Sequence, residues 1–149
     1  MEVCVTMAAL QSPPQPSTDA ARLRALAEYA ILDTEHEDSF DQLAVLAARL
    51  CSAPMAVVNF LDAERQWFKA QVGLDLSETP RSVSFCAHAI LEPSGWFVVP
   101  DASVDPRFAD SPLVTAGPEL RAYLGRVLHD PSGQAIGALA VADREPRDF

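Results

Sequence analysis

A thiol and an imidazole lie two residues apart where a short helix is expected, over residues 84–91. Ser84 is placed to cap this helix, so Cys86 falls in its first turn, where unpaired backbone N–H groups stabilise a thiolate. The pattern is compatible with a redox switch or a thiol reductase centred on Cys86. An inert core cysteine is the alternative, and it is the more common role in an apolar helix. Cys86 and His88 point to opposite sides of a helix, so they form no catalytic pair without a third element.

Further polar side chains occur around this segment. Arg81 directly precedes the helix, Asp101 opens an acidic loop, and Tyr123 lies in an expected strand that could face the helix. We predict that six residues converge on one cavity between sheet and helix: Arg81, Ser84, Cys86, His88, Asp101 and Tyr123. Because a helix start can receive an anion, a small polar or anionic ligand is expected. Replacing Arg81 with alanine should then weaken the ligand and leave the fold intact. The alternative is an ion-pair network that fixes the loop.

A second polar surface is expected on the strand formed by residues 66–72. Strict alternation puts Phe68 and Ala70 on one face and Trp67 and Lys69 on the other. The second face suits a ligand wall or a dimer surface. A solvated face with one covering tryptophan is the alternative.

Two N-terminal helices are expected, Asp19–Leu32 and Ser39–Ser52, each with an apolar stripe at helical spacing. The stripe of the second helix consists of Phe40, Leu43, Leu46, Ala47 and Leu50. Residues 55–61 and 135–142 are apolar on both faces, which predicts central strands of the sheet. The 101–118 loop is long enough to act as a lid. Helices followed by hairpins predict an α+β domain with an antiparallel sheet.

Composition limits the function classes. The 149 residues are 49% hydrophobic, enough for one domain with a full core, and they carry a net charge of −10. Nucleic-acid binding is disfavoured because phosphate contacts need clustered lysine and arginine. No run reaches the ~18–20 apolar residues of a membrane span. Three widely spaced cysteines without a CxxC pair favour a reducing, cytoplasmic location. The proline-rich residues 1–18 predict a disordered tail before a domain over residues 19–149.

Several motifs resemble one family. They are NFLD at 59–62, WFKA at 67–70, RSVSFCAHAI at 81–90, DPRF at 105–108 and IGAL at 136–139. Over roughly residues 22–148 the chain is similar to bacterial GAF domains of the type found N-terminal in sensor histidine kinases, diguanylate cyclases and phosphatases. The usual helix after the last strand is expected to be missing.

The resemblance implies a GAF/PAS-like sheet with helices on one side and a pocket on the other. It implies a non-enzymatic sensory or regulatory domain that binds a small molecule or mediates dimerisation. A homodimer through the two N-terminal helices, or an output signalling protein, is the implied partner. No cofactor is identified. Related domains attach bilin to a cysteine followed directly by histidine, and here Ala87 intervenes. Cys51 and Cys86 do not reproduce the loop cysteines of the related sulfoxide reductases.

Overall fold

Six strands form one sheet in which every neighbouring pair is antiparallel. The structure is a computed structural model that describes residues 13–149. The strands are β1 (Met55–Leu61), β2 (Arg65–Val72), β3 (Glu78–Pro80), β4 (Trp96–Val99), β5 (Ala122–His129) and β6 (Ala135–Asp143). Their order across the sheet is β3-β2-β1-β6-β5-β4. The predicted α+β class and the central positions of β1 and β6 are confirmed.

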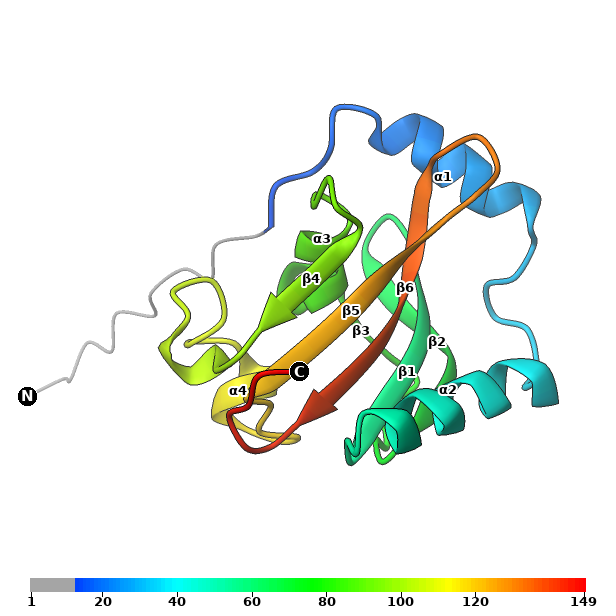
Figure 1. Cartoon of the computed structure of the whole chain (residues 1–149). Helices are drawn as coiled ribbons and strands as arrows, with labels where there is room; N and C mark the ends of the chain where they lie inside the picture. The colour runs from blue at the N-terminus through cyan, green and yellow to red at the C-terminus, as the bar shows by residue number, and fades with distance from the viewer. Residues whose placement is uncertain (1–12) are drawn as a thin grey trace, which may run out of the picture.

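Helices lie against both faces of this sheet (Figure 1). Helices α1 (Asp19–Glu28) and α2 (Asp38–Leu50) pack over β1, β2 and β6. The short helices α3 (Phe85–Ala89) and α4 (Pro112–Thr115) contribute Phe85 and Val114 to the core on the opposite face. This second face is the one on which the sequence predicts a pocket.

The loop regions hold more structure than the sequence predicts. Strand β3, which the sequence does not predict, pairs with β2. The expected 101–118 loop contains a 3-10 helix, η2 (Ala102–Val104), as well as α4. A second 3-10 helix, η1 (Arg81–Val83), leads into α3. Residues 13–18 form an irregular segment and a turn, and the first twelve residues of the predicted tail lie outside the described residues.

The predicted alternation of faces along β2 is wrong, because the strand contains a β-bulge. Val58 pairs with Ala70 and Asn59 pairs with Phe68, so Lys69 is left without a partner position. Phe68 consequently packs in the core on the α3 side, whereas Ala70 packs among residues on the α1–α2 side. An alternating pattern cannot predict this, because one extra residue reverses the faces that follow it.

The orientation of α2 also differs from the prediction. Ala44 and Ala48 are the buried residues of this helix, while Leu43, Leu46 and Leu50 of the predicted stripe are exposed. Alanines let the helix approach the sheet closely, and the three leucines remain exposed at the side of the helix next to β5 and β6. Within residues 13–149, no helix combines the length and the apolar character needed to cross a membrane.

Candidate functional site

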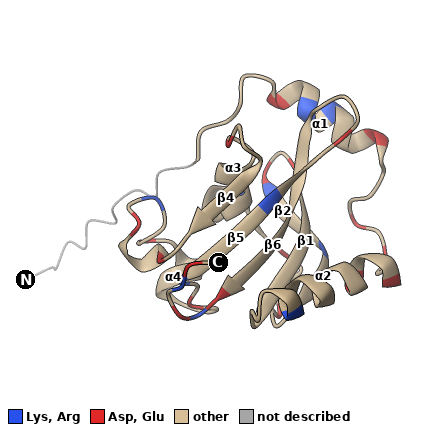
Figure 2. Cartoon of the chain, in the orientation of Figure 1, with Lys and Arg blue, Asp and Glu red and all other residues tan. Residues whose placement is uncertain are grey.

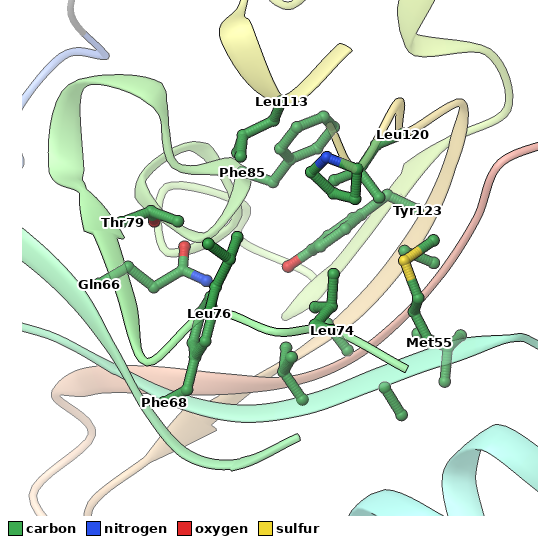
Figure 3. A pocket seen from close by; sticks show the side chains of 16 residues that line it. Met55, Gln66, Phe68, Leu74, Leu76, Thr79, Phe85, Leu113, Leu120 and Tyr123 are labelled. Carbon is green, nitrogen blue, oxygen red and sulfur yellow. The ribbon is translucent and has the colours of Figure 1, made fainter. Parts of the chain in front are cut away.

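A small cavity of about 40 Å³ lies between the sheet and the α3–α4 side of the domain (Figure 3). Its floor is formed by side chains that point from one face of the sheet, among them Val57 of β1, Phe68 of β2 and Ala140 of β6. Its other walls are Phe85 at the start of α3 and Leu113 of α4. Most of the lining is therefore carbon, as the apolar strand sequences require.

Two of the residues that line this space carry a buried hydroxyl group without a hydrogen-bond partner. These groups are the phenol of Tyr123 and Oγ1 of Thr79, each on a residue no more than 5% exposed. The side-chain amide of Gln66 lies beside Thr79 at the same wall (Figure 3), and its Oε1 accepts a hydrogen bond from the Ser84 hydroxyl. Buried polar groups are normally hydrogen-bonded, so these two hydroxyls leave hydrogen-bonding capacity that a water or a bound molecule can use.

The cavity carries no charged lining residue. Its sixteen lining residues include no lysine, arginine, aspartate, glutamate or histidine. Burial raises the pKa of Tyr123 well above its ordinary value, with a smaller contribution from nearby Cys86, so the phenol keeps its proton at neutral pH. The site can therefore both donate and accept hydrogen bonds, but it offers no charge to a ligand.

The position of Tyr123 depends on a glycine two residues further along β5. A Cβ atom at Gly125 would lie 2.8 Å from the Tyr123 hydroxyl, closer than packing allows. The missing side chain leaves room for the phenol ring. The ring is held between Phe85 and Phe97, with centroid distances of 5.1 Å and 5.9 Å.

Three leucine side chains from outside the sheet also line the cavity. Leu74 and Leu76 come from the segment between β2 and β3, and Leu113 comes from α4. All three are partly buried and pack against the same core cluster.

The six predicted site residues do not converge on this cavity, because only Tyr123 lines it. Arg81 is buried in an ion pair instead: its Nη2 lies 2.9 Å from Oδ1 of Asp19, and its Nη1 donates to the carbonyl of Asp62 at 3.2 Å. Arg22 also binds Asp19, through Nε at 2.9 Å. Arg81 therefore fastens α1 to the turn between β1 and β2, as the ion-pair alternative for this residue anticipated.

Ser84 and Cys86 have structural positions. The Ser84 hydroxyl accepts a hydrogen bond from the backbone N–H of Ala87 at 3.2 Å, which confirms it as the N-cap of α3. Cys86 is fully buried beside Leu61 and Ala138. Burial raises the pKa of its thiol to about 12, so it remains protonated at neutral pH. The thiolate expected at the helix start is thus disfavoured by burial.

His88 and Asp101 lie away from the cavity. The His88 ring packs against Phe108 with a centroid distance of 4.8 Å, and its pKa is lowered by burial and by nearby Arg107. Asp101 caps η2 by accepting a hydrogen bond from the N–H of Ser103. Neither residue is among those that line the cavity.

Trp67 and Lys69 form neither a ligand wall nor a solvated face, because both are buried. The Lys69 ammonium lies 2.6 Å from Oε2 of Glu37 and 2.7 Å from Oγ1 of Thr34. It therefore ties β2 to the segment that joins α1 and α2. Within residues 13–149 no group of three or more His, Cys, Asp or Glu side chains could hold a metal ion.

The sequence matches the GAF domain family over residues 35–149, which is most of the chain. The chain belongs to this family. GAF domains are sensory and regulatory domains of signalling proteins, and the family resemblance seen in the sequence is confirmed. The sheet and the placement of its helices agree with this assignment.

One relative of this GAF domain is the cyclic di-GMP phosphodiesterase PA2567 of Pseudomonas aeruginosa, 40% identical over 138 residues. The match covers 93% of this chain and 23% of the relative, so the chain spans about a quarter of that protein.

Solved structures share the fold at low identity. The GAF domain of an Acinetobacter phosphoenolpyruvate-protein phosphotransferase has a TM-score of 0.59 at 17% identity, covering 91% of this chain and 82% of the other. Free methionine-R-sulfoxide reductase from Neisseria meningitidis has a TM-score of 0.60 at 17% identity, covering 96% and 84%. At this identity the likeness concerns the fold alone.

Sequence reasoning missed Gln66 and Thr79 as cavity residues. Gln66 shares a strand face with Phe68, so its inward direction could have been read from the spacing of two residues. Thr79 lies on β3, a three-residue strand between polar segments. No local pattern marks that residue as inward-facing, since its direction is set by pairing with β2.

Proposed function

We propose that this GAF domain senses a small, uncharged, mostly apolar molecule that carries one hydrogen-bonding group. The observation that supports the proposal is the pair of unpartnered, buried hydroxyls of Tyr123 and Thr79 in an otherwise apolar cavity. This replaces the polar or anionic ligand expected from the sequence, because the arginine on which that expectation depended is bound to Asp19.

The energetics favour such a ligand. An unpaired buried polar group costs about 1–3 kcal/mol, and a ligand hydroxyl placed between Tyr123 and Thr79 would remove part of that cost. The apolar remainder of the ligand gains about 25 cal/mol for each Å² it removes from water. A charged ligand would lose its hydration with no opposite charge in the lining to replace it.

Ligand entry would move the segments that close the cavity. A volume of about 40 Å³ accommodates a few water molecules, whereas a benzene-sized guest occupies a cavity of about 150 Å³. A ligand with a ring would therefore displace Leu74 and Leu76 on one side and Leu113 on the other. Movement of these segments is the change by which occupancy would be transmitted.

We infer that the domain acts by regulation and not by catalysis. The alternative of a thiol reductase or redox switch is disfavoured by the burial and raised pKa of Cys86. The similarity to a cyclic di-GMP phosphodiesterase supports cyclic di-GMP turnover as the regulated output. A cytoplasmic location stays a prediction.

Phenol and benzoate test the proposal, because they share a ring and differ in charge. Phenol should raise the free energy of unfolding by RT ln(1 + c/Kd), where c is the free phenol concentration, and benzoate should not. The variant Ala142→Val adds two methyl groups to the cavity wall on a strand that accepts a branched residue, and it should abolish the phenol effect. Stabilisation by benzoate alone would reject the proposed ligand class.

A further inference from the structure

His88 is a titratable side chain that belongs to an aromatic cluster beside the cavity. Its partly buried ring lies 4.8 Å from the centroid of Phe108, edge to face, and 6.3 Å from that of Phe97, nearly parallel to it. Phe108 in turn stacks on Phe85 with a centroid distance of 4.0 Å. Because Phe85 lines the cavity, a single ring, that of Phe108, connects His88 to the cavity wall.

Arg107 brings a permanent positive charge to the same aromatic cluster. Its guanidinium lies 5.0 Å from the centre of the Phe97 ring and 5.3 Å from that of Phe108. Its Nε and Nη2 donate to the two carboxylate oxygens of Asp105, at 2.9 Å and 2.6 Å. The Asp105–Phe108 turn therefore carries an ion pair and a core ring together, and both of its charges act on His88.

The elements packed on α3 bring no further charge to His88 among residues 13–149. Figure 2 shows α3 and β4 without acidic or basic residues. Strand β5 presents Tyr123, whose phenol keeps its proton, and β6 presents Ala138. Glu92, which follows α3, acts on Arg107. The charge state of His88 is therefore set by its burial and by the Asp105–Phe108 turn.

A proton on His88 is unfavourable while this turn stays in place. Burial lowers the pKa of His88, and the charge of Arg107 lowers it further, whereas Asp105 has a smaller, opposite effect. Both oxygens of Asp105 are already bound to Arg107, so an imidazolium beside them gains little from that carboxylate. Moving the turn away from α3 would separate the two positive charges and expose the His88 ring to water.

We propose that His88 makes the cavity sensitive to acid, because its protonation displaces the Asp105–Phe108 turn from α3. Phe108 leaves with the turn, and Phe85 then loses the ring that holds it at the cavity wall. A proton on His88 and a molecule in the cavity consequently oppose one another, and this coupling is reciprocal. The ligand half of the inference rests on the proposed function, whereas the movement of the turn does not.

A titration of the isotope-labelled chain from about pH 8 to about pH 5, followed by nuclear magnetic resonance, tests the movement without any ligand. The His88 ring should titrate with a midpoint below 6.5. The Phe85 and Phe108 signals should shift with the same midpoint, and the nuclear Overhauser contacts between these two rings should weaken. Contacts that persist while His88 titrates would overturn the proposal.

Histidine variants show whether His88 is the group responsible. His88→Gln should remove the pH-dependent shifts of Phe85 and Phe108. His129→Gln is the matched control, because His129 is exposed at the end of β5, and it should leave the shifts unchanged. Circular dichroism establishes that each variant is folded. Shifts that survive in His88→Gln would assign the response to another group and overturn the proposal.

Arg107→Gln tests the repulsion directly. The variant removes the like charge and frees the carboxylate of Asp105, so the midpoint of His88 should rise. An unchanged or lower midpoint would contradict the role given to Arg107.

Dissociation constants for phenol at about pH 7.5 and about pH 5 test the link to the cavity, because phenol is uncharged at both values. The constant should rise about fivefold or more at the lower pH in the wild type and in His129→Gln, and it should stay within about twofold in His88→Gln. Equal binding at both pH values would overturn the inference and leave the proposed function intact. Absence of phenol binding at either pH would reject the proposed function, and the ligand-free titration then decides the movement of the turn.

Discussion

Replacing Arg81 with alanine should destabilise the domain without altering its ligand binding. Arg81 is 6% exposed, and its guanidinium makes two bonds to Asp19, at 2.9 Å and 3.1 Å. It also contacts the carbonyls of Asp62 and Ala63. Breaking a buried ion pair costs about 3–5 kcal/mol. Asp19 keeps its bond to Arg22, so we expect the lower end, about 3 kcal/mol.

Urea unfolding followed by circular dichroism measures this loss. Arg24→Ala is the control, because Arg24 lies on α1, the helix that carries Asp19. Arg24 is exposed and has no side-chain hydrogen bond among the described residues. Its free energy of unfolding should stay within about 0.5 kcal/mol of the wild type. A stable Arg81→Ala variant that binds phenol more weakly would refute the reasoning and return Arg81 to the binding site.

Acid should reduce the difference in free energy of unfolding between the wild type and Arg81→Ala. Burial alone would raise the pKa of Asp19, but hydrogen bonds from Arg81 and Arg22 outweigh it, and the pKa lies below 3.8. A depressed carboxyl pKa stabilises the folded state above the unfolded pKa, and this contribution is lost as the pH falls through the folded value. The measured difference should therefore be constant near pH 7 and should shrink below about pH 4.

Three further variants or reagents address the cavity and the thiol. Tyr123→Phe should leave the free energy of unfolding unchanged or raise it by up to about 1 kcal/mol, and it should weaken phenol binding about fivefold. A large loss of stability would contradict the absence of a partner for the Tyr123 hydroxyl. Gly125→Ala should cost about 1–3 kcal/mol in urea unfolding because its Cβ displaces the Tyr123 ring, and unaltered stability would argue against that contact. Alkylation mapped by peptide mass spectrometry should modify Cys86 only as fast as the domain opens, and rapid labelling would favour the redox alternative.

The sequence predicts the centre of the sheet well and the helix faces less well. Continuous apolar runs belong to strands covered on both faces, and β1 and β6 are such strands. The predicted stripe on α2 is wrong because its large leucines are exposed and do not face the core. In the structure Ala44 and Ala48 are the buried residues of α2. A hydrophobicity pattern does not predict that small residues are buried in preference to large ones.

The candidate site is less predictable because it depends on long-range pairing. The inward direction of Tyr123 could be predicted from the alternation of its strand. The bulge at Lys69 and the short strand that carries Thr79 could not, because both depend on pairing with neighbouring strands. Arg81 is predicted from the sequence to contact a ligand, with an ion-pair network as the alternative, and the sequence does not reveal its partner. Its partner, Asp19, lies sixty-two positions earlier in the chain, a separation that no local motif reveals.

The cavity between the sheet and α3 is proposed to bind an uncharged molecule. A titration of the isotope-labelled chain with phenol, followed by nuclear magnetic resonance, tests it most directly. With phenol, the signals of the cavity residues should shift together and saturate; these residues are Leu74, Leu76, Leu113 and Tyr123. The signals of Leu46 should not shift. The variant Ala142→Val should remove the response of the cavity residues. Benzoate should leave the cavity signals unchanged. Saturable shifts with benzoate and none with phenol, or phenol shifts confined to the α2 surface, would contradict the account.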